Sequence, residues 1–280
     1  MATRIGCDNL VYAVQKTDSA TARPTYNAIK SAVGVMSLNI NPNSNLATLF
    51  CDDGPSENAV SLGNIEVEIQ KNALTTTQKA DLLGHEIDAN GGLVYGANDV
   101  APWVAIGFRT LKSNGKYRYV WLYKGKFMEP EESSETKGDN VNFQADTIKG
   151  QFVKLDRRFT VNGKSKAVWK YEVDAETASV NTDLLADWFR KVQLLDQGSI
   201  SGVVTESAGS TPLGGVLVTA DTSETTITAA VTGAYKLTNV TPGTRTLTFS
   251  KTSYTSGTIA DIAVAEYAAV VDKNITLTLA

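Results

Sequence analysis

The chain has 280 residues, of which 42% are hydrophobic and 20% are charged, the composition of an ordinary globular protein. This length suits two medium-sized domains better than one large domain. The formal net charge of −4 gives no basic footprint, so we do not expect a protein that binds nucleic acid by neutralising its phosphates.

The opening stretch MATRIGCDNL lacks the apolar core of a secretion signal, and no apolar run approaches the roughly 20 residues that span a bilayer. We therefore expect synthesis in the cytosol and no membrane insertion. Cys7 and Cys51 are too few for a disulfide framework or a four-thiolate zinc site. Cys51 has no basic neighbour in sequence, so a passive thiol is the simpler interpretation.

Strand-like alternation dominates the first part of the chain. In GNIEVEIQK, Ile65, Val67 and Ile69 fall on one face, while the two glutamates between them fall on the other. This period of two predicts a half-buried strand. The stretches VNFQADTIKGQFVKL and AVWKYEVD continue the pattern, so the first module is predicted to be mainly β.

A short helix is predicted in the stretch TTTQKADLLGH. Thr75 and Gln78 have the spacing of a capping box, and Gly84 suits the left-handed exit of a helix. His85 follows, where an imidazole is favourable beside the partial negative charge of the helix end. A catalytic base is the alternative interpretation of His85.

A hairpin is predicted in TLKSNGKYRYVWLYKGKF. Asn114 and Gly115 would supply the positive φ angles of a tight turn, and aromatic residues alternate at positions 117, 119, 121 and 123 of the arm that follows. The acidic run MEPEESSETKGD comes next. A solvated loop is its ordinary interpretation, and a calcium site is the alternative, although the spacing does not match an EF-hand loop. The candidate acidic loop residues are Glu129, Glu131, Glu132 and Glu135.

A second, amphipathic helix is predicted in NTDLLADWFRKVQLL, with Thr182 or Asp183 as its cap. Apolar residues recur there at three- and four-residue spacing, and we expect this helix to pack on the sheet and close the first domain. The composition then shifts toward Gly and Ser. The domain boundary is therefore placed between residues 1–196 and residues 197–280.

Catalytic chemistry finds little support in the sequence. A single histidine excludes a two-histidine metal site and makes any Ser-His-Asp arrangement depend on His85. There is no G-x-S-x-G elbow or Walker loop, and GGLVYG at residues 91–96 is interpreted as a plain turn. We predict no enzymatic activity, no bound metal and no cofactor.

The first module resembles the major tail proteins of long, non-contractile-tailed bacteriophages, the siphoviruses. The similarity covers roughly residues 4–192 and rests on the ordered series DDGP, LLGH, KYRYVWLYKGKF and ETKGD, with a closing DWF. It implies a virion tail tube protein: a β-sandwich or barrel with a flanking helix, assembled as hexameric rings that stack into a hollow tube. The implied partners are further copies and other tail proteins, with DNA passing through the bore without specific binding.

In such a tube, residues 37–61 are interpreted as an arm that reaches a neighbouring subunit or ring, because a free loop of this length is unusual in a compact domain. The segment has too few apolar residues for a core of its own, so we expect it to be disordered in the monomer. The candidate contact residues are Leu46, Leu49, Phe50, Asp52 and Asp53, of which the two aspartates also suit a turn.

Residues 197–280 resemble carboxypeptidase regulatory-like domains, which are small transthyretin-like or Ig-like β-sandwiches. The resemblance is carried by ISGVV, PLGGVLV, TGAYKL and VTPGTRTLTF. Short β-branched runs between Gly or Pro turns agree with a sandwich. A folded module of this size could hardly share a bore with DNA, so we expect an outward decoration that contacts host-surface glycans weakly or stabilises the tail.

Two other functions stay open. The tube protein of a contractile or secretion-type injection machine shares the implied fold. A glycan-binding protein, or a hydrolase with an accessory sandwich, would need a signal peptide and, for hydrolysis, paired catalytic carboxylates.

Overall fold

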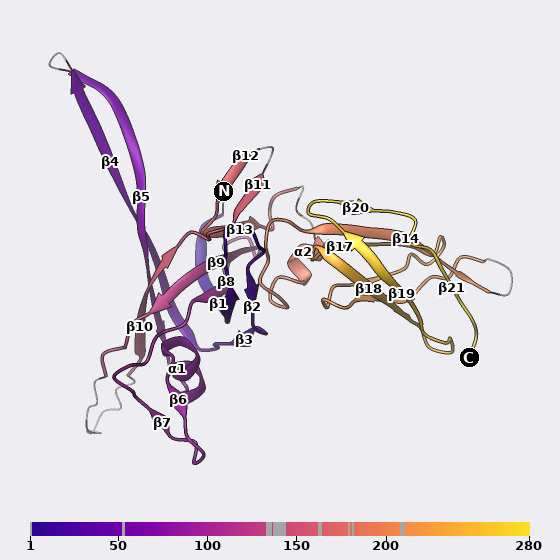
Figure 1. Ribbon diagram of the computed structural model, residues 1–280, viewed down its shortest axis with the longest axis horizontal. Helices are drawn as coiled ribbons and strands as arrows, with labels where there is room; N and C mark the ends of the chain where they lie inside the picture. Colours follow the sequence, from indigo (N-terminus) through magenta and orange to yellow (C-terminus); the bar gives the residue numbers. More distant parts are fainter. Residues whose placement is uncertain are drawn as a thin grey trace. The chain divides into compact units, whose positions relative to one another are not determined.

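The computed structural model describes residues 2–51, 54–132, 136, 144–161, 164–178, 180, 182–207 and 211–280, with side chains described outside residues 45–60 and 183. The chain is mainly β and divides into two compact units (Figure 1). The first unit comprises residues 1–159, 163–180 and 191–193, and the second comprises residues 160–162, 181–190 and 194–280. The helices in the described part of the chain, of eight and five residues, are too short to cross a membrane.

The first unit is built on a nine-stranded sheet of order β2-β1-β8-β9-β10-β5-β4, with β3 attached to β1 and β13 attached to β9. Its strands are β1 (Arg4–Thr17), β2 (Thr25–Tyr26), β3 (Lys30–Ser31), β4 (Val35–Cys51), β5 (Gly54–Lys71), β8 (Val104–Lys112), β9 (Tyr117–Phe127), β10 (Asp146–Val153) and β13 (Lys170–Asp174). Strand β9 is central, because it pairs with β8 along one edge and with β10 and then β13 along the other.

Two small hairpins extend from this sheet. One consists of β6 (Glu86–Ile87) and β7 (Leu93–Val94), and the other of β11 (Arg158–Val161) and β12 (Lys164–Ala167). The turn expected near residues 91–96 is confirmed in its first part, since Gly91 has a φ of +83° and joins β6 to β7.

The main core of the first unit lies between the sheet and the helix α1 (Thr76–Leu83), which places Leu82 and Leu83 among the buried strand residues. The alternation predicted for residues 63–71 is confirmed. Its three branched residues, at 65, 67 and 69, are buried, and Glu66 and Glu68 are exposed.

The predicted capping of α1 is also confirmed. Gln78 N–H donates to Thr75 Oγ1 at 3.2 Å, and Thr75 N–H donates to Gln78 Oε1 at 3.3 Å, which completes a capping box. Gly84 ends the helix with a φ of +85°. A Cβ at Gly84 would also lie 2.4 Å from the carbonyl oxygen of Val100, so both backbone conformation and space require glycine.

The hairpin of β8 and β9 forms at the expected place, but its turn differs from the prediction. Only Gly115 adopts a positive φ, of +76°, and Asn114 does not. Gly115 N–H donates to Lys112 O, and Lys112 N–H donates to Lys116 O. The connection between β8 and β9 is therefore longer than the two-residue turn that we predicted, which would need positive φ angles at both of its residues.

The second predicted helix was wrong in length and in packing. Helix α2 covers only Thr182–Ala186, and afterwards Trp188 N–H donates to Leu185 O and Arg190 N–H donates to Asp187 O, which are tight three-residue turns. Helix α2 packs against β17 (Ala234–Val240) of the second unit, not on the first sheet. The apolar residues whose spacing suggested a long helix lie partly in these irregular turns, where Trp188 is completely buried.

The expectation of a disordered arm over residues 37–61 was also wrong. Strands β4 and β5 pair antiparallel along their whole length, from Val35 opposite Lys71 to Cys51 opposite Gly54. Strand β4 lies at the edge of the sheet and pairs only with β5, so its outward positions need not be apolar. Its asparagine-rich sequence therefore gave no recognisable strand pattern.

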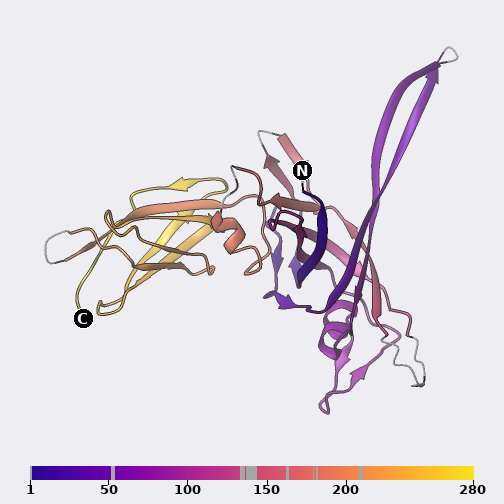
Figure 2. The ribbon, with the colours of Figure 1, turned by 180° about the vertical axis from the view of Figure 1, so that it is seen from behind.

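The second unit is an Ig-like sandwich of two four-stranded sheets, of order β17-β14-β20 with β21 beside β14, and β16-β15-β18-β19. Its remaining strands are β14 (Gly198–Glu206), β15 (Leu217–Ala220), β16 (Thr225–Ile227), β18 (Gly243–Ser250), β19 (Gly257–Val264), β20 (Ala269–Val270) and β21 (Ile275–Leu277). The two sheets enclose their own core, which includes Val216, Leu247 and Phe249. Figure 2 shows this sandwich, in orange and yellow, from behind.

Candidate functional site

The most distinctive feature of the first unit is the ribbon formed by β4 and β5, which projects beyond the rest of the sheet (Figure 1). Strand β10 pairs with β5 only over residues 65–71. Beyond the pair of Ser44 and Leu62, no third strand lies beside the ribbon in the described residues. The projecting part therefore has two unpaired edges.

The predicted contact residues of the arm are distributed along this ribbon. Leu46 pairs with Val60 in the ladder, and Leu49 pairs with Glu57. Phe50 pairs with Pro55 just after a register shift. Asp52 and Asp53 lie outside the described residues.

The acidic loop is not simply solvated, because two of its predicted residues form ion pairs. Glu132 pairs with Lys79 of α1, and Glu129 Oε1 lies 2.7 Å from His85 Nε2, without the alignment of a hydrogen bond. Glu131 is exposed, and Glu135 lies outside the described residues. Sequence reasoning missed both pairs, since their members are far apart in the chain.

His85 lies between two carboxylates. Its Nδ1 is 2.6 Å from Asp99 Oδ2, and its ring packs against Tyr95 with the ring centroids 4.3 Å apart. The His85 hydrogen bond, followed by one from Gly96 N–H, holds the pKa of Asp99 below its usual value. Because the side chain is only 3% exposed and both nitrogens face carboxylates, the geometry favours a structural tie over a catalytic base.

Two open hollows lie on the outer face of the sheet beside this acidic segment. One has a volume of about 620 Å³ and is lined by Glu68, Glu131 and Lys149, among others. The second, of about 370 Å³, lies over Glu66, Lys149 and Gln151. The lining is polar and lacks a histidine or cysteine, and no group of three or more candidate metal ligands occurs among the described residues.

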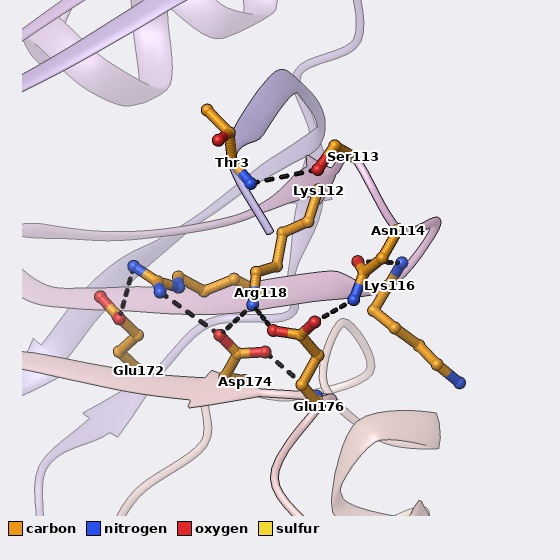
Figure 3. Close-up of polar contacts among 9 residues, drawn as sticks. All are labelled: Thr3, Lys112, Ser113, Asn114, Lys116, Arg118, Glu172, Asp174 and Glu176. Carbon is orange, nitrogen blue, oxygen red and sulfur yellow. Dashed lines mark hydrogen bonds and ion pairs between the residues drawn. The ribbon is translucent and has the colours of Figure 1, made fainter. Parts of the chain in front are cut away.

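A second ion-pair network surrounds the turn between β8 and β9 (Figure 3). Lys112 Nζ lies 2.7 Å from Asp174 Oδ2 and also contacts Glu176. Arg118 bridges Asp174 at 3.3 Å and Glu172 at 3.1 Å. The network joins the turn to the end of β13.

The N-terminus is attached at the same turn. Ser113 N–H donates to Thr3 O at 2.8 Å, and Thr3 N–H donates to Ser113 Oγ at 3.1 Å. Together, the ion pairs and these hydrogen bonds connect the N-terminal end of β1, the turn between β8 and β9, and the end of β13. We call this region the structural clasp of the first unit.

The second unit contains a buried carboxylate that the sequence did not reveal. Glu224 is 1% exposed, and its Oε1 accepts hydrogen bonds from Thr241 N–H and Thr241 Oγ1, each at 3.0 Å. Thr222 Oγ1 donates to the other oxygen. This carboxylate fixes the turn before β16 to the turn between β17 and β18.

Comparison with known proteins identifies only the second unit. Residues 199–278 match the sequence profile of the carboxypeptidase regulatory-like domain family, which confirms the prediction for this part of the chain. No curated protein sequence matches the chain.

Solved structures add distant similarities. One is to the Bacillus anthracis TIE protein, with 9% identity over 96% of this chain and a TM-score of 0.25; the chain spans only 40% of that protein. Another is to the group B streptococcus pilus 2b backbone protein, with 12% identity over 78% of this chain and 93% of that one, and a TM-score of 0.22. TM-scores this low do not define a shared fold. The resemblance of residues 4–192 to phage tail proteins stays a prediction.

Proposed function

We propose that the protein is a structural subunit of a phage tail tube, whose copies associate into hexameric rings that stack around a bore for DNA. The observation that carries the proposal is the projecting ribbon of β4 and β5. From Ser44 to Cys51 this ribbon extends roughly 23 Å at about 3.3 Å per residue.

A two-stranded ribbon of this length is marginally stable alone in water. It also presents backbone N–H and C=O groups along both edges, which are a template for pairing with another chain. A partner that covers the ribbon would stabilise it. A neighbouring copy of the same protein supplies such a partner in every subunit of a closed ring.

The separate Ig-like sandwich suits the role of an outward decoration, because it has its own core and does not contribute strands to the nine-stranded sheet. Weak contact with host-surface glycans or stabilisation of the tail would be its task. The formal charge of −4 per chain, repeated around a ring, would repel DNA phosphates wherever it faces the bore. The location of the protein would accordingly be the virion tail, after synthesis in the cytosol of the bacterial host.

The tube protein of a contractile or secretion-type injection machine would use the same ribbon in the same way. Electron microscopy of the particle distinguishes the two, because a contractile machine surrounds its tube with a sheath. A glycan-binding protein with an accessory sandwich is the remaining alternative, and in that case the purified protein would bind glycans as a monomer.

Negative-stain electron microscopy of the purified full chain tests the proposal, with rings or tubes as the expected result. The double variant Leu49→Ser, Phe50→Ser should lose about 2 to 4 kcal/mol per interface if both side chains are buried there, and should assemble poorly while its monomer stays folded. Asn41→Ser, on the part of β4 beside the sheet, is the matched control. A wild-type chain that stays monomeric at high concentration would contradict the proposal.

A further inference from the structure

The first unit, which includes residues 158–159 and 164–167 of the hairpin of β11 and β12, carries charges of opposite sign at two ends of its sheet. The hairpin of β6 and β7 lies at one end with α1, and the hairpin of β11 and β12 lies at the other (Figure 1). We call residues 86–100 and 128–132 the acidic end, and β11 and β12 the basic hairpin. Figure 2 shows the same separation from behind.

The acidic end has more negative charge than its own cations neutralise. Lys79 pairs with Glu132, and His85 lies between Asp99 and Glu129. Two further carboxylates, Glu86 and Glu131, are exposed and form no ion pair with another described residue. Asp88 is also exposed and bonds only to the backbone and side chain of its own turn.

The acidic end also exposes apolar side chains. Ile87, Val94 and Tyr95 are 43%, 53% and 54% exposed, and Val100 is 71% exposed. Single exposed apolar residues are ordinary on a protein surface. Four of them within the 14 residues of the segment 87–100 mark an interaction surface.

The basic hairpin offers the complementary charge. Arg158, Lys164 and Lys166 are exposed there, and within the described residues none of them forms an ion pair. The Arg158 guanidinium is held across the hairpin, since Nε donates to Ser165 Oγ at 2.9 Å and Nη2 donates to Ser165 O at 3.0 Å. Its charge is therefore presented on a fixed element.

We propose that the acidic end of one copy docks on the basic hairpin of a second copy, so that copies associate head to tail. The two surfaces differ, so the contact is heterologous and leaves one free surface of each kind after every addition. Opposite charges set the direction of addition and oppose the reverse, head-to-head contact. This inference rests on the proposed function, in which it would be the contact between stacked rings.

Charge-reversal variants of the full chain test the docking. The first variant is Lys164→Glu, Lys166→Glu, and the second is Glu86→Lys, Glu131→Lys. Each variant alone removes two attractive charges from one surface and puts two repulsive charges in their place, so we expect the association between copies to weaken about tenfold or more in sedimentation velocity at low salt. The third variant combines all four substitutions and should recover part of the association, because the substituted positions again oppose each other in sign while Arg158 and Asp88 keep their charges.

Mixing provides the decisive result. An equimolar mixture of the first and second variants should recover long assemblies, because each contact then joins opposite charges in alternation. A matched control, Lys236→Glu on β17 of the second unit, should associate normally. All four substituted side chains are exposed, and circular dichroism would confirm that the folds are unchanged.

The outcomes separate this inference from the proposed function. Normal tubes from both single-surface variants, or no recovery in the mixture, would overturn the docking while the tube proposal stands. Charge-dependent open chains without rings would support the docking and reject the tube. A wild-type chain that never self-associates would overturn both.

Discussion

Lys112 Nζ lies 2.7 Å from Asp174 Oδ2, and this pair ties the end of β8 to the end of β13 across the central strand β9. The Lys112 side chain is only 5% exposed. Its hydrogen bond lowers the pKa of Asp174, and the bonds to Asp174 and then Glu176 raise the pKa of Lys112. The pair therefore contributes stability only while both groups are charged.

The pH dependence of stability follows from the lowered pKa of Asp174 and the raised pKa of Lys112. Because the pKa of Asp174 is lowered on folding, its contribution is complete above the unfolded value of about 4 and is lost as the pH falls through the folded value. Because the pKa of Lys112 is raised, its contribution is complete below about pH 10 and is lost at more alkaline pH. Urea unfolding from pH 3 to pH 11 should show Asp174→Asn less stable than the wild type between pH 4 and pH 10, and the difference should shrink progressively below and above that range. A stability difference independent of pH would show that the charges are not its source. Glu172→Gln, at an exposed position of the same network, should have a smaller effect.

Gly107 should resist substitution because Trp121 occupies the space of a side chain. A Cβ at Gly107 would lie 2.7 Å from the buried Trp121 ring, so Gly107→Ala should lose about 1 to 3 kcal/mol of the free energy of unfolding. Gly6, in the neighbouring strand β1, has nothing within 4 Å of such a Cβ, and Gly6→Ala is the matched control. Chemical denaturation would measure both variants, and equal stabilities would show that the sheet adjusts around Trp121.

The capping box of α1 gives a further stability prediction. Thr75→Ala removes the oxygen that accepts the Gln78 N–H, so it should cost about 1 kcal/mol. Thr77→Ala, at an exposed position of the same first turn, should stay within about 0.5 kcal/mol of the wild type. If both variants unfold at the same temperature as the wild type, the cap contributes nothing measurable.

The buried carboxylate of Glu224 in the sandwich gives another stability prediction. Glu224→Leu leaves Thr241 N–H and its hydroxyl without their acceptor, which should cost about 1 to 3 kcal/mol. The exposed Lys236 on β17 serves as the control, through Lys236→Leu. Calorimetry resolves this effect if the two units unfold separately. An unchanged transition of the second unit would indicate that water replaces the carboxylate.

The sequence predicted the elements whose signals are local. The capping box at Thr75, the exit at Gly84 and the alternation around Val67 each depend on a few consecutive residues, and all three are confirmed. The family profile likewise confirms the sandwich. Helix α2 was mispredicted because apolar spacing alone does not reveal which residues, such as Trp188, a tertiary core will bury outside a helix.

The candidate site was less predictable, for a physical reason. Its ion pairs join residues far apart in the chain, such as Lys79 with Glu132 and Lys112 with Asp174, and no local pattern announces them. The ribbon was missed because an edge strand that pairs with a single neighbour needs little hydrophobic period for a pattern to detect.

The pairing of β1 with β8 has a consequence for biosynthesis. Val14 pairs with Val104, so the first strand must wait until residues beyond 104 have left the ribosome, and β9 must wait longer for β13. The ribbon of β4 and β5 depends only on residues 35–71 and is complete much earlier. The nascent chain can thus pair β4 with β5, although only marginally stably, before the rest of the sheet exists, at a stage when neighbouring chains on the same messenger RNA present the same edges. Slow translation between residues 71 and 174 would therefore favour aggregation, and holding this interval short, or covering the ribbon with a chaperone, becomes a condition for producing soluble subunits.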